Sequence, residues 1–121
     1  MLTKPHKNLE QWKKSIALVK DVYSLTEKFP RTEVHSLTDQ MRRAAISVPS
    51  NIAEGAARST KKEFVQFLHI SQGSLSELDT QFEVALALSY LTMTIVEPVT
   101  KRMDEIDKML TGLIKSLQKN S

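Results

Sequence analysis

The sequence predicts an all-α protein, an antiparallel four-helix bundle of up-down-up-down order that forms a single domain over residues 1–121. Glycine occurs only three times and proline four times, which is too seldom for the many tight turns of a β-rich fold. Apolar residues recur at steps of three and four along four stretches, the spacing of a helix face that packs lengthwise on another helix. The connections between these stretches are short, and short connections place successive helices antiparallel.

Residues 8–28 and 36–56 are the first two predicted helices. We expect Asn8 to cap the first helix, which must end before Pro30. Ser36 is a suitable cap residue for the second. The packing face predicted for the first helix steps by three and four through Leu9, Trp12, Ile16, Val19, Tyr23 and Thr26.

Residues 60–91 and 95–118 are the third and fourth predicted helices. Thr60 and Glu63 match a capping box at the start of the third, which would extend for roughly 45 Å at 1.5 Å per residue. This helix carries two apolar seams, which predicts two sets of neighbours. Pro98 is expected in the first turn of the fourth helix, where proline is tolerated.

A polar stretch that contains a proline, SVPSNIAEGAAR at residues 47–58, interrupts the second predicted helix. Pro49 lacks an N–H group, so we expect the helix to kink or break there. Gly55 offers a tight exit or a close contact with another backbone. Polar residues also interrupt one seam of the third helix, and a guanidinium that faces a carboxylate can satisfy it. We therefore predict a structural polar layer that fixes helix register, formed by Arg42, Arg43, Ser47, Asn51, Glu54, Ser74 and Glu77.

The sequence offers little for catalysis. It contains no cysteine, which excludes disulfides, thiol catalysis and thiolate zinc sites and favours a reducing compartment. Glu54 and Glu77 are the carboxylates with a conceivable acid–base role, but no histidine stands at a useful spacing from them. The Glu-x-x-His motif of metal-binding bundles is absent. We expect no enzymatic activity, no cofactor and no metal.

No signal peptide and no apolar run of 18 residues occurs, so a soluble, cytoplasmic protein that binds no membrane is expected. The net charge is +3, but residues 1–31 carry seven Lys or Arg against three acids, whereas residues 64–92 carry three acids and no Lys or Arg. Such a contrast is compatible with subunit association, with a surface for polyanions, or with ordinary solvation. Trp12 beside Lys13 and Lys14 is more typical of a core tryptophan than of a base-stacking residue.

One long stretch resembles the signature of bacterial four-helix bundle proteins encoded in intervening sequences of 23S ribosomal RNA genes. It reads QMRRAAISVPSNIAEGAARSTKKEFVQFLHISQGSLSEL. Its most specific part is RRAAISVPSNIAEG, followed by Glu63–Phe64, Gly73–Ser74 and Glu77–Leu78. The resemblance covers nearly the whole chain, from Leu9 to about Leu91. The chain has SQGS where alanine often precedes the glycine-serine pair, a small departure.

This resemblance implies a homopentameric ring of bundles. It also implies kinship with the accessory variability protein of diversity-generating retroelements, a basic pentameric barrel that binds nucleic acid and a reverse transcriptase. We therefore expect RNA or DNA to bind a basic surface. The alternative is a structural or adaptor ring that docks a protein such as a reverse-transcriptase-like enzyme, without binding nucleic acid. The residues expected to contact phosphates are Lys13, Lys14, Lys20, Lys28, Arg31, Lys101, Arg102 and Lys108.

Overall fold

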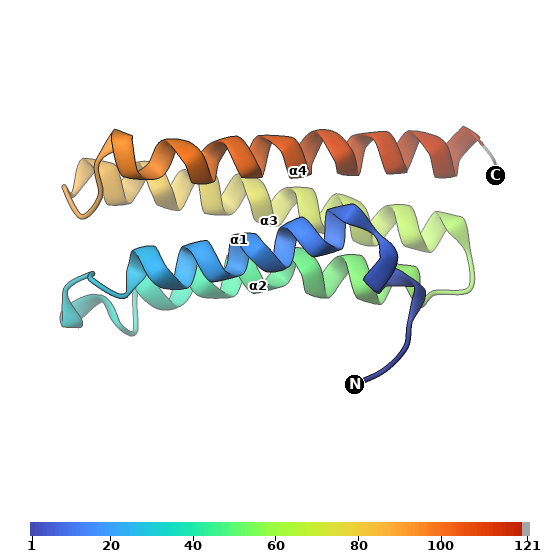
Figure 1. Cartoon of the computed structure of the whole chain (residues 1–121), viewed down its shortest axis with the longest axis horizontal. Helices are drawn as coiled ribbons and strands as arrows, with labels where there is room; N and C mark the ends of the chain where they lie inside the picture. Colours follow the sequence, from blue (N-terminus) through green and yellow to red (C-terminus); the bar gives the residue numbers. More distant parts are fainter. Residues whose placement is uncertain (120–121) are drawn as a thin grey trace.

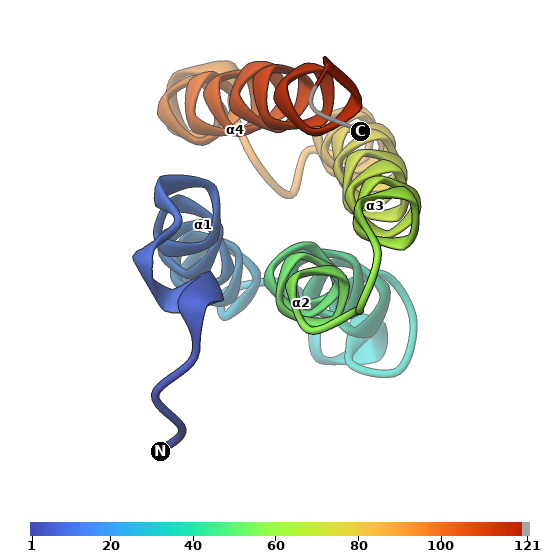
Figure 2. The same ribbon diagram turned by 90° about the vertical axis from the view of Figure 1, so that its right-hand side faces the viewer.

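The computed structural model describes residues 1–119, and within them the chain is all-α with no strand. The four α-helices lie side by side and run alternately in opposite directions (Figure 1). Viewed along the bundle, α1 neighbours α2 and α4, and α3 closes the square between α2 and α4 (Figure 2). The elements are η1 (Pro5–Asn8), α1 (Glu10–Thr26), η2 (Arg31–Glu33), α2 (Leu37–Ala56), α3 (Lys61–Ala87) and α4 (Met93–Lys119).

Two of the predicted helix starts differ in how they are capped. Thr60 and Glu63 form the predicted capping box at α3, because the Thr60 hydroxyl oxygen accepts the Glu63 N–H at 3.1 Å. Asn8 does not cap α1. It belongs to the 3-10 turn that Pro5 begins, so Leu9 takes the cap position without a side-chain cap bond.

The turn between α3 and α4 begins earlier than predicted, because α3 ends at Ala87. Ser89 has a φ of 62°, a left-handed conformation that stops the helix, and the Tyr90 N–H donates to the Ala85 carbonyl at 2.9 Å. The Tyr90 hydroxyl donates to Glu33 Oε2 at 2.7 Å, and its ring packs on Phe29 at 5.2 Å. These contacts join the α3–α4 turn to the α1–α2 turn at one end of the bundle.

The helix α2 continues through Pro49, which excludes the break, one of the two predicted outcomes, and it is a single helix from Leu37 to Ala56. Asn51 Nδ2 donates to the Ser47 carbonyl at 2.8 Å, and Ser71 Oγ of α3 donates to the Val48 carbonyl at 3.0 Å. Side chains from both helices thus bond to the two carbonyls that precede Pro49, whereas the carbonyl that loses its helical partner to this proline is that of Ala45.

The face of α1 that packs on the core is not the predicted one. Leu18 and Val22 are fully buried, whereas Ile16 is 44% exposed and Tyr23 is 40% exposed. Of the predicted face, Ile16 and Tyr23 turn outward, whereas Thr26 is buried and Leu9, Trp12 and Val19 pack partly buried against the core. The core lies between all four helices and includes Leu18, Val22, Met41, Val48, Ile52, Leu68, Leu78, Phe82, Ile106 and Leu110. Each such buried side chain stabilises the fold by about 1.5–3 kcal/mol.

Candidate nucleic-acid interface

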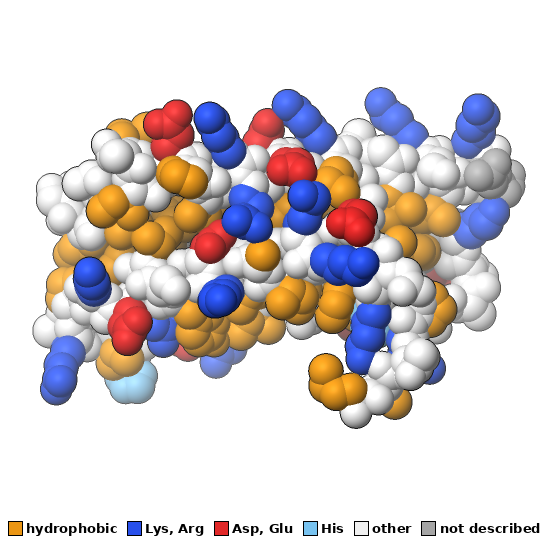
Figure 3. All heavy atoms as spheres, viewed as in Figure 1, with side chains coloured by type: hydrophobic (Ala, Val, Ile, Leu, Met, Phe, Trp, Pro, Cys, Tyr) orange, Lys and Arg blue, Asp and Glu red, His pale blue; other side chains and the backbone are white. Residues whose placement is uncertain are grey.

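The cations predicted to contact phosphates lie on α1, on the α1–α2 turn and on α4. Figure 3 shows blue Lys and Arg side chains on the α1–α4 face, with red carboxylates among them. Lys14 Nζ lies 2.8 Å from Glu105 Oε1, and Arg102 Nε lies 3.0 Å from Asp21 Oδ2. These two ion pairs link α1 to α4. Lys14 and Arg102 are therefore partly neutralised by carboxylates of the neighbouring helix.

The other six predicted cations divide into two groups. Lys13 lies 3.5 Å from Glu10, and Lys108 lies 3.0 Å from Asp104, both within one helix. The side chains of these four residues are more than half exposed, so the pairs are weak in water. Four cations are exposed and make no ion pair within residues 1–119, namely Lys20, Lys28, Arg31 and Lys101.

Three of the seven predicted polar-layer residues meet between α2 and α3. The Ser47 and Ser74 hydroxyl oxygens lie 2.8 Å apart, and Asn51 Nδ2 donates to Ser47 Oγ at 2.9 Å. Ser74 also donates to the Ile70 carbonyl at 3.2 Å. Because Ser74 is only 8% exposed, these bonds satisfy hydroxyls that water scarcely reaches.

The remaining members bond elsewhere. Arg42 points toward α1, where its Nε donates to Thr26 Oγ1 at 2.9 Å and its guanidinium lies 4.4 Å from the centre of the Tyr23 ring. Glu54 pairs with Arg58 at 2.8 Å. No bond joins Arg42 or Arg43 to Glu77 within the described residues, because each cation has a nearer partner one helical turn away or on α1.

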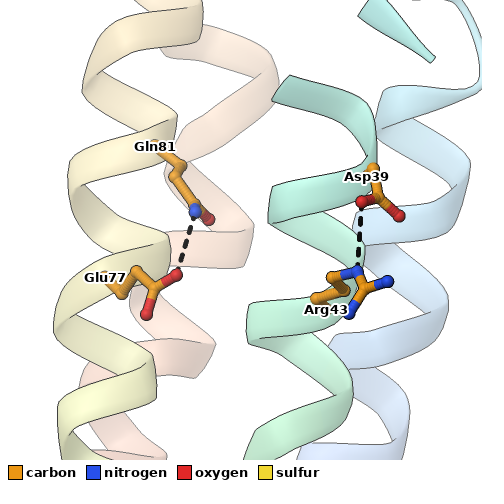
Figure 4. A network of polar contacts seen from close by, with 4 residues as sticks. All are labelled: Asp39, Arg43, Glu77 and Gln81. Atoms are coloured by element: carbon orange, nitrogen blue, oxygen red, sulfur yellow. Dashed lines mark hydrogen bonds and ion pairs between the residues drawn. The ribbon is translucent and has the colours of Figure 1, made fainter. Parts of the chain in front are cut away.

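Two polar pairs face each other across the outer side of α2 and α3 (Figure 4). Arg43 Nε lies 3.0 Å from Asp39 Oδ2 on α2, and Gln81 Nε2 donates to Glu77 Oε1 at 3.3 Å on α3. Gln81 is 7% exposed, and its Oε1 has no hydrogen-bond partner among residues 1–119. A buried acceptor without a donor is costly to the fold.

An apolar groove between α1 and α2 was not predicted. Trp12, Ile16 and Val19 line it from α1, and Ile46 and Pro49 line it from α2. His6 packs edge-on against Trp12, with the ring centres 5.2 Å apart. The sequence signal for this groove is the predicted α1 seam itself, because a regular apolar seam is equally suited to an outer interface and to a core.

Residues 1–119 contain no group of three or more His, Asp or Glu side chains able to hold a metal ion together. Among the helices of the same region, none combines the length and the apolar character that crossing a membrane requires.

A family model described as 23S rRNA-intervening sequence protein matches residues 7–112 of this chain. No curated protein matches it. A crystal structure of a protein with unknown function from the S23 ribosomal protein family, from Bacteroides thetaiotaomicron, has a similar fold, with a TM-score of 0.77. The two sequences are 21% identical, and the match covers 87% of this chain and 98% of that one. The structural likeness supports the four-helix fold alone.

Proposed function

The chain belongs to the 23S rRNA-intervening sequence protein family, and from this premise we propose that it is a non-enzymatic, cytoplasmic protein that binds nucleic acid through exposed cations. The observation that carries this proposal is the number of cations without a carboxylate partner. Of 17 Lys and Arg side chains, ten make no ion pair within residues 1–119. They are Lys4, Lys7, Lys20, Lys28, Arg31, Arg42, Lys62, Lys101, Lys115 and Lys119.

Unpaired cations favour a polyanion because each phosphate that they neutralise releases condensed counterions. Contacts of this kind position a nucleic acid but carry no information about its bases. The proposed binding is therefore sequence-independent and strongly dependent on salt.

We further propose that the chain acts as a homo-oligomeric ring, with five copies as the expected number. Two different apolar surfaces support a ring. One is the α1–α2 groove, and the other is the outer side of α3, where Ile70, Val84 and Leu88 are 41–50% exposed. When two unlike surfaces of one chain pair head to tail, the assembly closes into a ring if the rotation fits. A ring would multiply a modest charge per chain into a polyvalent one.

The second candidate function is a structural or adaptor ring that docks a protein partner such as a reverse-transcriptase-like enzyme. The apolar α1–α2 groove favours this candidate, because exposed apolar surfaces rimmed by polar groups are typical of protein contacts. In that case the lysines would serve solubility.

Fluorescence anisotropy with a labelled single-stranded RNA, at about 50 and 200 mM salt, tests the first function. We expect binding at the lower salt and, for six or more phosphate contacts, a loss of affinity of about 10²-fold or more at the higher salt. A protein that binds no RNA at 50 mM salt contradicts the proposal. In that case, recovery of one stoichiometric protein partner after nuclease treatment would support the adaptor function.

A further inference from the structure

Charge is distributed unevenly along the bundle. The start of α1, the α2–α3 turn and the last turns of α4 lie together at one end (Figure 1). Contacts agree with this placement. Lys61 and Lys62 of α3 line the same hollow as Leu117 of α4, and Gln11 Nε2 of α1 donates to the Met109 carbonyl of α4 at 3.2 Å. We call the region formed by residues 1–13, 51–70 and 111–119 the basic end.

The basic end carries eight Lys or Arg side chains against three acids, a net charge of +5. The rest of the bundle, residues 14–50 and 71–110, carries nine against eleven, a net charge of −2. Together, the basic end and the rest of the bundle account for the whole side-chain charge of +3. A charge count along the sequence hides this separation, because the basic end is assembled from three distant segments.

The ion pairs increase the difference in charge between the basic end and the rest of the bundle, because they leave few carboxylates free at the basic end. Two of the three acids of the basic end, Glu10 and Glu54, pair with cations of the same end, and the third, Glu63, bonds with the Thr60 hydroxyl in the capping box. The cations of this end that make no ion pair with any residue of the described part, 1–119, are Lys4, Lys7, Lys62, Lys115 and Lys119. In the rest of the bundle, seven acids against five cations make no ion pair within residues 1–119, and these acids are Glu27, Glu33, Glu77, Asp79, Glu83, Glu97 and Asp107. Those carboxylates would repel a phosphate chain from the rest of the bundle.

Three cations of the basic end, Lys62, Arg58 and Lys7, are positioned by backbone or side-chain contacts. Lys62 lies in the first turn of α3, whose start is fixed by the Thr60–Glu63 capping box. The Arg58 guanidinium lies 4.7 Å from the centre of the Phe67 ring, and it also pairs with Glu54. Lys7 donates to the Leu2 carbonyl, which leaves its charge without a carboxylate. Charges held in place lose less conformational freedom when they meet phosphates.

We propose that the basic end, rather than the α1–α4 side predicted from the sequence, is the surface that binds the phosphate backbone of RNA. This inference rests on the proposed nucleic-acid function and specifies its site. The cations come from three segments and are spread over an end of the molecule, so they suit a polymer of phosphates better than one small anion. In a cyclic ring whose rotation axis runs along the bundles, symmetry brings every basic end to the same face.

Two double variants with the same change of net charge test the location. Lys62→Glu with Lys115→Glu alters the basic end, and Lys20→Glu with Lys101→Glu alters the rest of the bundle. All four lysines are exposed and make no ion pair within residues 1–119. Circular dichroism, the thermal midpoint and the sedimentation mass are measured first, to show that both variants keep the fold and assembly of the wild type.

Affinity for the labelled RNA is then measured against salt for the three proteins. We expect the basic-end variant to bind at least about tenfold more weakly, with a salt slope lower by about 1.4 for the two lost contacts. The control variant also removes two unpaired cations, so it should bind RNA more weakly than the wild type, but by a smaller factor than the basic-end variant. An equal loss in both variants, or a larger loss in the control, overturns the location but leaves the proposed function standing. Wild-type protein that binds no RNA overturns the function itself, and the location with it.

Discussion

Gly55 of α2 and Phe67 of α3 approach so closely that no side chain fits at residue 55. A methyl carbon added to Gly55 would lie 2.7 Å from Phe67 Cβ, 3.0 Å from Phe64 Cδ1 and 3.2 Å from the Phe64 carbonyl oxygen. Two of these atoms belong to or adjoin the α3 backbone, so they cannot move aside as the tip of a flexible side chain would. The glycine thus sets how tightly α2 and α3 pack beside the basic end.

Gly55→Ala should destabilise the protein by about 1–3 kcal/mol, because overpacking forces backbone shifts that outweigh the higher helix propensity of alanine. Gly73→Ala and Gly112→Ala are matched controls inside helices, and a methyl carbon at either position meets nothing within 4 Å. We expect each control to stabilise the protein by about 0.5–1 kcal/mol. Urea unfolding measures all three. A Gly55→Ala protein as stable as the controls would show that the two helices separate at little cost.

The sequence predicts the helical architecture well because its signals are local. The Thr60–Glu63 box marks the start of α3, and the small residue Gly55 marks a close backbone contact. The rotation of α1 about its own axis is not a local property. Both the Ile16 seam and the Leu18 seam have helical spacing, and only the packing against α2 and α4 decides which seam is buried.

The candidate site is harder to predict for a related reason. Nothing in the sequence indicates a carboxylate partner for Lys14 or Arg102. In the structure, Lys14 pairs with Glu105 of α4, and Arg102 pairs with Asp21 of α1. Such pairs depend on the register of α1 against α4, which no single segment encodes. The basic end likewise becomes visible only when three segments distant in the sequence are brought together.

The Ser47–Ser74 contact should couple α2 to α3 energetically. Ser47→Ala and Ser74→Ala are each expected to cost about 0.5–1.5 kcal/mol, because each leaves a shielded hydroxyl without its 2.8 Å partner. In the double variant no hydroxyl is left unpaired, so the combined loss should be smaller than the sum of the single losses. Urea unfolding of the four proteins gives the coupling, with exposed Ser76→Ala as the control. Strict additivity would mean that the two hydroxyls do not depend on each other.

Tyr90 should lose its phenolic proton at a higher pH than a free tyrosine does. The hydrogen bond to Glu33 is the main cause that raises its pKa above the ordinary 10.0, with burial and the Glu33 charge adding to it. Tyr23 is the other tyrosine, so a Tyr23→Phe background isolates the Tyr90 signal in an absorbance titration of tyrosinate. In this background we expect a midpoint above 10.0, and Glu33→Gln should lower it. An unchanged midpoint after Glu33→Gln would contradict the bond.

The same pKa shift has a consequence for stability. Because the folded protein holds the Tyr90 proton more tightly than the unfolded chain, the stabilising effect of this bond is complete below pH 10.0 and declines as the pH rises through the folded pKa. Tyr90→Phe, which has no proton to lose, should therefore show a weaker decline of unfolding free energy in alkaline solution. If the unfolding free energy falls with pH equally steeply in the wild type and in Tyr90→Phe above pH 10.0, this contribution of Tyr90 is excluded.

Ile46 tests whether the α1–α2 groove is an interface between copies of the chain. In a ring it would be buried against the neighbouring copy, although in the single chain it is 42% exposed. A lysine there would leave an ammonium group without a partner inside an apolar contact, at a cost of several kcal/mol per interface. In the separate chain the same lysine would reach water without penalty. Ile46→Lys should therefore lower the assembly mass and leave the helical content unchanged.

Analytical ultracentrifugation measures that mass. We expect the wild type to sediment at about five times the 13.7 kDa chain mass and Ile46→Lys to sediment at lower mass at the same concentration. Val34→Lys is the matched control, because Val34 is 51% exposed at the α1–α2 turn and lies outside the groove, so it should keep the wild-type mass. If Ile46→Lys also keeps the wild-type mass, the groove faces solvent in the assembly and remains accessible to a partner of another kind. The ring contacts would then have to be sought on the outer side of α3, at Ile70 and at Gln81, whose Oε1 accepts no hydrogen bond from residues 1–119.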